Sequence, residues 1–180
     1  AARCLWSAGD VGKLGRVLDP ADSGQDMAHI WYLALTGRTA AAIAYLDGKS
    51  GPNSAPQPVH DAIRATLIAR ESGAAQDLSN ATAAAMRIAG KGHFGTSVAI
   101  AQLATLGAID EALAVAEGYY LERGPIRVSY NSAIWSDTHR AELTRRNTRP
   151  LFMAQTAPLR ADARFEALVG DMGLQRYWEA

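Results

Sequence analysis

Residues 98–120 constrain the fold of this 180-residue chain most, because they predict two helices joined by a tight turn at Gly107. Glycine suits that turn, since the left-handed backbone that often ends a helix carries little steric cost for glycine. After the turn, apolar residues recur at three- and four-residue steps and therefore fall on one face of a helix. They are Ile109, Ala112, Leu113, Ala116 and Tyr119. Asp110 and Glu111 suit the positive end of that helix's dipole. We expect a helical hairpin here.

Candidate turn glycines recur along the chain before Gly107. Gly73 lies 34 residues before Gly107, Gly37 lies 36 residues before Gly73, and Gly9 lies 28 residues before Gly37. Repeated hairpins with a period of about 34 residues are typical of tetratricopeptide (TPR) arrays. One spacing matches that period, and the other two depart from it in opposite directions.

The Gly107 unit resembles a TPR repeat. The matching residues are Leu103, Leu106, Gly107, Ala112 and Leu113. The Gly37 unit matches second best. Ala42 and Ile43 lie five and six residues after Gly37, which is the spacing of Ala112 and Leu113 after Gly107. The two remaining units carry Leu78 and Leu14 where alanine is expected.

Helix periodicity and end signals predict the remaining elements, and no segment has the alternating pattern of a strand. A proline-containing loop is expected over 48–57. The expected helices are one ending near Ser7, then 11–18, a helix from Asp22 or Ser23 to Thr36, 39–47, 58–71 and 74–89.

The C-terminal residues 148–180 resemble the segment that closes the TPR regions of many bacterial multidomain signalling proteins. The resemblance lies in Leu151-Phe152, Pro158-Leu159-Arg160, Asp162, Arg164-Phe165, Leu168, Gly173-Leu174 and Tyr177-Trp178. Ala163 stands where that family often has proline. In such proteins the repeats follow a winged-helix DNA-binding domain or a nucleotide-cyclase domain. We expect the tail's apolar residues to cover the open end of the last repeat, as a solenoid requires; an aromatic docking site for a partner is the alternative.

These patterns together predict an all-α fold. Three to four hairpins would stack as a short right-handed, TPR-like antiparallel helical-hairpin solenoid (an αα superhelix) with a C-terminal helical cap. Residues 1–122 would form the repeats around Gly9, Gly37, Gly73 and Gly107, and residues 123–180 an Arg-rich connector and the capping segment.

Charge and composition exclude several classes of function. The 18 basic and 18 acidic residues give a formal net charge of zero, so nothing in the total favours nucleic acid or an anionic membrane. The longest uncharged run, 92–109, holds glycines and polar residues and predicts a buried helix rather than a membrane span.

Cys4 is the only cysteine, which excludes an internal disulfide and fits a cytoplasmic location. The opening Ala1-Ala2-Arg3 resembles a cut end, so we expect a piece of a longer chain.

Motifs for catalysis, metals and cofactors are absent from the sequence. Residues 90–95 satisfy G-x-G-x-x-G, but a helix is expected before them where a dinucleotide site needs a strand, so we interpret the glycines as a break between helices.

The four histidines form no H-x-x-x-H or H-E-x-x-H pair. Neighbouring residues such as His60 and Asp61 point about 100° apart on a helix, which does not suit a shared metal. No cofactor is expected. The Arg-rich stretch 123–149 is interpreted as a solvated face rather than a site for an acidic partner or a phosphate backbone.

The sequence therefore favours a non-catalytic interaction or sensory module, part of a bacterial signalling or transcription-regulating protein. It would bind a protein, a peptide or a neighbouring domain in the groove lined by the first helix of each hairpin, without direct contact to nucleic acid or membrane. The candidate binding residues there are Gln25, Arg64 and Gln102. Two alternatives stay open, which are an enzyme without a recognisable motif and an oligomerisation element using Phe165, Tyr177 and Trp178.

Overall fold

The computed structural model describes residues 10–19, 26–49, 55–128 and 147–178, and every regular element in these residues is helical. The prediction of an all-α fold is thus confirmed. The elements are α2 (Val11–Val17), α3 (Asp26–Leu35), α4 (Thr39–Asp47), α5 (Gln57–Ser72), α6 (Ala75–Ile88), α7 (Gly92–Leu106), α8 (Ile109–Tyr120), α10 (Arg149–Phe152), the 3₁₀ turn η2 (Ala154–Thr156), α11 (Ala157–Arg160), α12 (Arg164–Asp171) and α13 (Leu174–Trp178).

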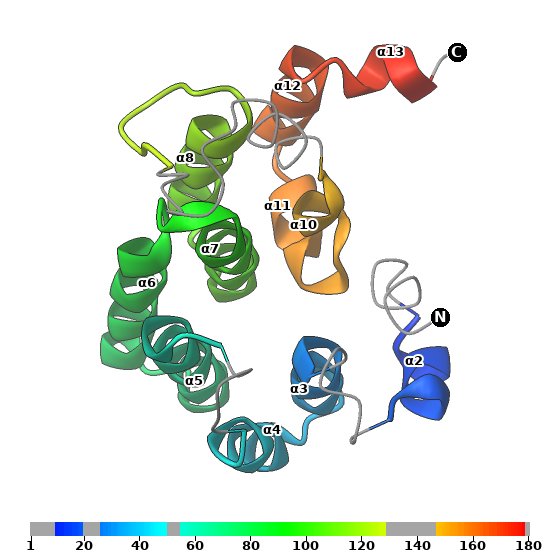
Figure 1. Ribbon diagram of the computed structural model, residues 1–180, viewed down its shortest axis with the longest axis vertical. Helices are drawn as coiled ribbons and strands as arrows, with labels where there is room; N and C mark the ends of the chain where they lie inside the picture. Colours follow the sequence, from blue (N-terminus) through cyan, green and yellow to red (C-terminus); the bar gives the residue numbers. More distant parts are fainter. Residues whose placement is uncertain (1–9, 20–25, 50–54, 129–146, 179–180) are drawn as a thin grey trace, which may run out of the picture.

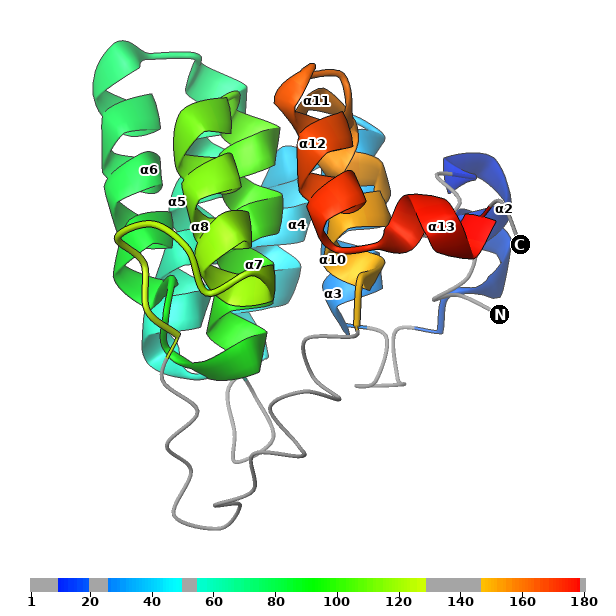
Figure 2. The same cartoon turned by 90° about the horizontal axis from the view of Figure 1, so that it is seen from above.

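Consecutive helices pack against one another in chain order. Each helix from α3 to α8 contacts the next, so that together they form an arc (Figure 1). Seen at right angles, α5, α6, α7 and α8 stand side by side (Figure 2). For the helices predicted over 11–18, 39–47, 58–71 and 74–89, the observed limits lie within one residue of the predicted limits, and 39–47 matches at both ends. Helix α7 begins at Gly92, before the start of the hairpin predicted over 98–120. The predicted caps Asp22 and Ser23, the helix ending near Ser7 and the turn residue Gly9 lie outside the described residues, whereas the second helix of the Gly9 unit is α2.

The turn glycines have the left-handed backbone that the sequence predicted. Gly107 has φ +76° and Gly37 has φ +75°. At both turns the next residue's N–H donates to the carbonyl five residues back, from Ala108 to Leu103 at 3.0 Å and from Arg38 to Leu33 at 2.9 Å. This is the Schellman closure of a helix end. The two units that match the repeat pattern best therefore turn in the same way.

Helix α7 is the centre of the core. Its residues Gly95, Thr96 and 98–104 are all buried. Helices α5, α6 and α8 cover it on one side, and α10, η2 and α11 cover it on the inside of the arc (Figure 1). A helix covered on all sides has no polar stripe, which explains the uncharged run over 92–109. Among the described residues, no helix is long and apolar enough to cross a membrane.

In the C-terminal tail, residues 149–160 fold back along α7, and the helices after them extend beyond α8. Arg160 stabilises the folded-back part, because its Nη1 donates to the carbonyls of Leu151 (3.0 Å) and Met153 (2.9 Å) and lies 3.0 Å from the Thr156 hydroxyl. Burial lowers the pKa of this guanidinium, which nevertheless stays charged. Phe165 is buried and meets Phe152 edge to face at 6.0 Å. The tail thus belongs to the same core as the hairpins.

Ion pairs join the last helices to α8. Arg164 lies 2.7 Å from Asp110 and 2.8 Å from Asp162, while Arg123 pairs with Asp171. All of these side chains are partly or largely exposed to solvent, so each pair contributes little to stability on its own. Their effect is to orient α12 against the start and end of α8.

The first residues of the connector lie tightly on α8. A methyl group added at Gly118 would stand 2.5 Å from the Ile126 carbonyl oxygen. The side chains of Ile126 and Val128 pack on the core. Glycine at 118 therefore permits a close approach between a helix and an extended segment.

We expect the substitution Gly118→Ala to lower the free energy of unfolding by about 1–3 kcal/mol, because the added methyl forces the Ile126 backbone away. In an ordinary helix the same change stabilises by about 1 kcal/mol. Urea unfolding followed by circular dichroism measures the sign. Gly12→Ala in α2 is the control, since its methyl would meet only an Asp10 side-chain oxygen at 3.9 Å. A stabilised Gly118→Ala variant would show that residues 124–128 do not pack on α8 as described.

Candidate binding surface

Two of the three predicted binding residues lie in the described part of the chain, and they have opposite environments. Arg64 is exposed on α5, whereas Gln102 on α7 is completely buried. Gln25 lies outside the described residues. A partner could reach the Gln102 amide only if the helices around α7 separated.

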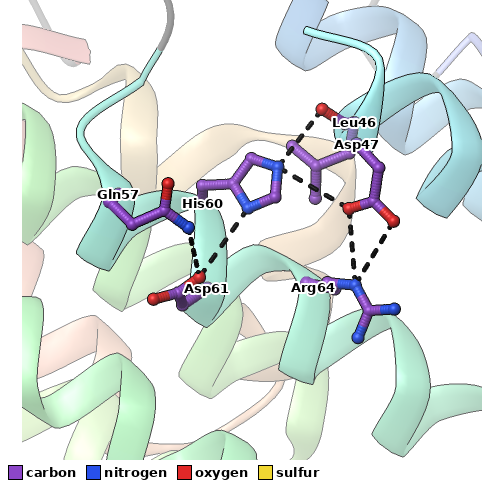
Figure 3. Close-up of polar contacts among 6 residues, drawn as sticks. All are labelled: Leu46, Asp47, Gln57, His60, Asp61 and Arg64. Atoms are coloured by element: carbon purple, nitrogen blue, oxygen red, sulfur yellow. Dashed lines mark hydrogen bonds and ion pairs between the residues drawn. The ribbon is translucent and has the colours of Figure 1, made fainter. Parts of the chain in front are cut away.

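Arg64 belongs to a polar cluster where the end of α4 meets α5 (Figure 3). His60 and Arg64 are four residues apart on α5 and therefore share a face. Both approach Asp47, the last residue of α4. Arg64 Nε lies 3.3 Å from Asp47 Oδ1 and 3.4 Å from Oδ2, and His60 Nε2 lies 3.7 Å from Oδ1.

The imidazole of His60 anchors this cluster. Its Nε2 lies 3.2 Å from the Leu46 carbonyl oxygen, which can only accept a hydrogen bond. The neutral ring therefore carries its hydrogen on Nε2. Its Nδ1 is buried without a hydrogen-bond partner and lies 3.9 Å from Asp61 Oδ1. Asp61 in turn accepts a bond of 2.7 Å from Gln57 Nε2 one turn earlier on α5.

The exposed edge of the Arg64 guanidinium defines what this surface can bind. Only Nε faces Asp47, and the two terminal nitrogens point away from that carboxylate (Figure 3). Nearly half of the side chains of Arg64 and Asp47 is accessible to solvent, at 46% and 43%. A guanidinium with one edge in use can take a second carboxylate on its terminal nitrogens. We call Asp47, His60, Asp61 and Arg64 the α4–α5 cluster.

The sequence did not identify this cluster as a whole. Sequence spacing relates His60 only to its neighbour Asp61 and says nothing of Asp47. In the part of the chain that is described, no three His, Cys, Asp or Glu side chains are placed to hold a metal ion. Asp47 and Arg64 belong to different helices, and no spacing rule within one helix connects them.

The two other described histidines lie in separate places. His29 on α3 stacks on Tyr45 of α4 with ring centres 4.4 Å apart. Burial and the nearby Arg38 and Lys49 lower its pKa. His93 lies in the first turn of α7, and burial lowers its pKa too. Both imidazoles are thus held neutral at neutral pH in unconnected clusters.

The glycine motif at 90–95 separates two helices, as predicted. It follows α6 rather than a strand, and Gly90 and Gly92 have φ +84° and +74°. Thr96 closes the turn, because its hydroxyl accepts the Gly90 N–H at 3.2 Å and donates to the Gly92 carbonyl at 2.7 Å. The Gly90 N–H and the Gly92 carbonyl are thus bonded within the turn itself.

Comparisons with protein-family models, with curated proteins and with solved structures gave no match for this chain.

Gln102 permits a direct stability test, because neither amide atom has a hydrogen-bond partner in the described structure. A buried amide without partners costs roughly 1–3 kcal/mol. We expect Gln102→Met, which keeps the side-chain length, to raise the free energy of unfolding by about 1 kcal/mol.

Thermal and urea unfolding would measure this change. Gln76→Met on α6 is the control, since Gln76 is exposed and bonds only to Asn80 at 3.0 Å. Its effect is expected to stay within about 0.5 kcal/mol. A destabilised Gln102→Met variant would mean that the amide makes a stabilising polar contact in solution.

Proposed function

We propose that this chain is a non-catalytic, TPR-like helical module that binds an acidic peptide or protein segment on the α4–α5 cluster. The observation that carries the proposal is the Arg64 guanidinium, which is partly exposed and directs its terminal nitrogens away from Asp47. Arginine in this state suits a carboxylate, because two parallel N–H donors match its two oxygens.

A polar mode of binding also agrees with the rest of the described surface. Among the residues whose side chains the structure describes, the exposed large apolar side chains are Val17 on α2 and Phe94 on α7. An apolar groove of the size that usually marks a docking site is therefore not formed by these residues. In this proposal, charged contacts at α5 are the source of specificity.

The wider context of the proposal comes from the sequence. The hairpins and the closing tail resemble the TPR regions of bacterial signalling and transcription-regulating proteins. A cytoplasmic sensory module that binds a partner protein or a neighbouring domain of the same parent chain fits that resemblance. Direct contact with nucleic acid or membrane is not part of the proposal.

Selection from a displayed peptide library tests the binding proposal. We expect the wild-type chain to enrich peptides rich in Asp and Glu, and we expect Arg64→Gln to bind the selected peptides about tenfold more weakly, because one charge-assisted hydrogen-bond pair is lost. Fluorescence anisotropy would measure the affinities, which should fall as salt is added.

Two further variants sharpen this test. Arg70→Gln is the matched control, since Arg70 is exposed in the last turn of the same helix and should leave affinity unchanged. Asp47→Asn should strengthen binding, because Asp47 competes for the guanidinium. The proposal fails if no acidic peptides are enriched, or if Arg64→Gln binds them as well as the wild type does.

A further inference from the structure

His93 joins three separate parts of the fold. It lies in the first turn of α7, and its ring stacks on that of Tyr119 at 5.7 Å between centres. Tyr119 belongs to α8 and is completely buried. The Tyr119 hydroxyl is bonded to Nδ1 of the imidazole. On the other side of the ring, Nε2 lies 3.4 Å from Nδ2 of Asn147, two residues before α10.

The hydrogen bonds of Asn147 determine which nitrogen of His93 carries the hydrogen. Asn147 Oδ1 accepts the backbone N–H of Arg149 at 3.3 Å, so the amide nitrogen is the group that faces the ring. An amide nitrogen can only donate, and His93 Nε2 must therefore accept. It follows that the neutral ring carries its hydrogen on Nδ1 and donates it to the Tyr119 oxygen.

Asn147 lies two residues before the segment 149–160, which covers α7 on the inside of the arc; we call these residues the inner segment. Its carbonyl accepts the Tyr120 hydroxyl at 3.1 Å. Four residues later, Leu151 of α10 is completely buried in the core. The contacts of His93 and Tyr120 therefore hold the start of the inner segment against the ends of α7 and α8.

We propose that His93 is an acid-sensitive latch, which holds the entry to α10 at neutral pH and releases it when the ring is protonated. The added proton would go to Nε2, where it would face the N–H donors of Asn147. Two donors cannot bond to each other, so the contact would be lost. The Tyr119 oxygen can still accept from Nδ1, so the ring stays on α8 while Asn147 separates from it.

Among the described residues, no acidic group compensates for the added charge. The described groups that face the ring are the Tyr119 hydroxyl from α8 and the Asn147 amide from the residues before α10. Lys91 and Arg149, two residues away from His93 and Asn147, are both cations. On α8, Glu117 is exposed and about 200° around the helix from Tyr119. Burial accordingly lowers the pKa of His93.

The sign of the pH dependence follows from that shift. A histidine whose pKa is lower in the folded chain binds its proton more readily when unfolded, near the ordinary value of about 6.5. The stabilising contribution is therefore complete above that value and is lost as the pH falls below it. The latch should be closed near pH 7.5 and open progressively toward about pH 5.

Hydrogen exchange of the backbone amides over 147–152 tests the proposal directly. After correction for intrinsic rates, we expect opening of these amides to become several-fold more frequent between about pH 7.5 and pH 5, as loss of one hydrogen bond implies. His93→Gln, which cannot be protonated, should remove this acid response. Nitrogen-15 NMR of the imidazole should show the hydrogen on Nδ1 at neutral pH.

The control is His29→Gln, because His29 also has a lowered pKa but lies on α3. This variant should keep the acid response at 147–152. The proposal is overturned if protection of these amides does not change with pH, if His93→Gln retains the response, or if the neutral ring carries its hydrogen on Nε2. Should His93→Gln fold poorly, the NMR titration of His93 in the wild-type chain decides alone, since a pKa at or above the ordinary value contradicts the latch.

Discussion

Residues 98–104 of α7 are buried on every side, and this burial determines how the neighbouring elements are arranged. A helix with no polar face cannot be stable in water unless neighbouring elements cover it completely. The hairpins supply α5, α6 and α8, and the inside of the arc would expose apolar side chains if nothing lay on it. The return of α10, η2 and α11 covers that side. Leu151 and Leu159 are completely buried there, and each contributes roughly 1.5–3 kcal/mol by leaving water.

This packing also limits where a partner can bind. In a simple stack of hairpins, the first helices would line an open inner surface. Here the α7 part of that surface is occupied by the chain's own tail, and Arg160 holds the tail in its turn through two carbonyl groups. No described element covers the exposed polar groups of α5 and the end of α4 in this way. The proposed contact with an acidic partner therefore lies at the α4–α5 cluster rather than at Gln102.

The local features of the fold could be predicted from the sequence, because local rules determine them. Gly37, Gly73 and Gly107 mark turns through a backbone conformation that favours glycine. The limits of α4 follow from its periodicity and its flanking residues. The return of the tail could not be predicted in this way, since it depends on contacts such as that of Thr105 Oγ1 with the Gln155 carbonyl, 50 residues later in the chain. The pairing of Asp47 with Arg64 could not be predicted for the same reason. The burial of Gln102 could not be predicted either, because a polar side chain is ordinarily expected at the surface.

The packing of residues 149–160 on α7 implies that the two unfold together as one cooperative core. Native-state hydrogen exchange at neutral pH, across a series of denaturant concentrations, tests this. We expect the slowest amides of α7 and those of α10 to α11 to exchange with the same opening free energy, equal to that of global unfolding. If the amides of 149–160 open at a much lower free energy while α7 remains protected, the tail is only loosely attached and does not belong to the cooperative core.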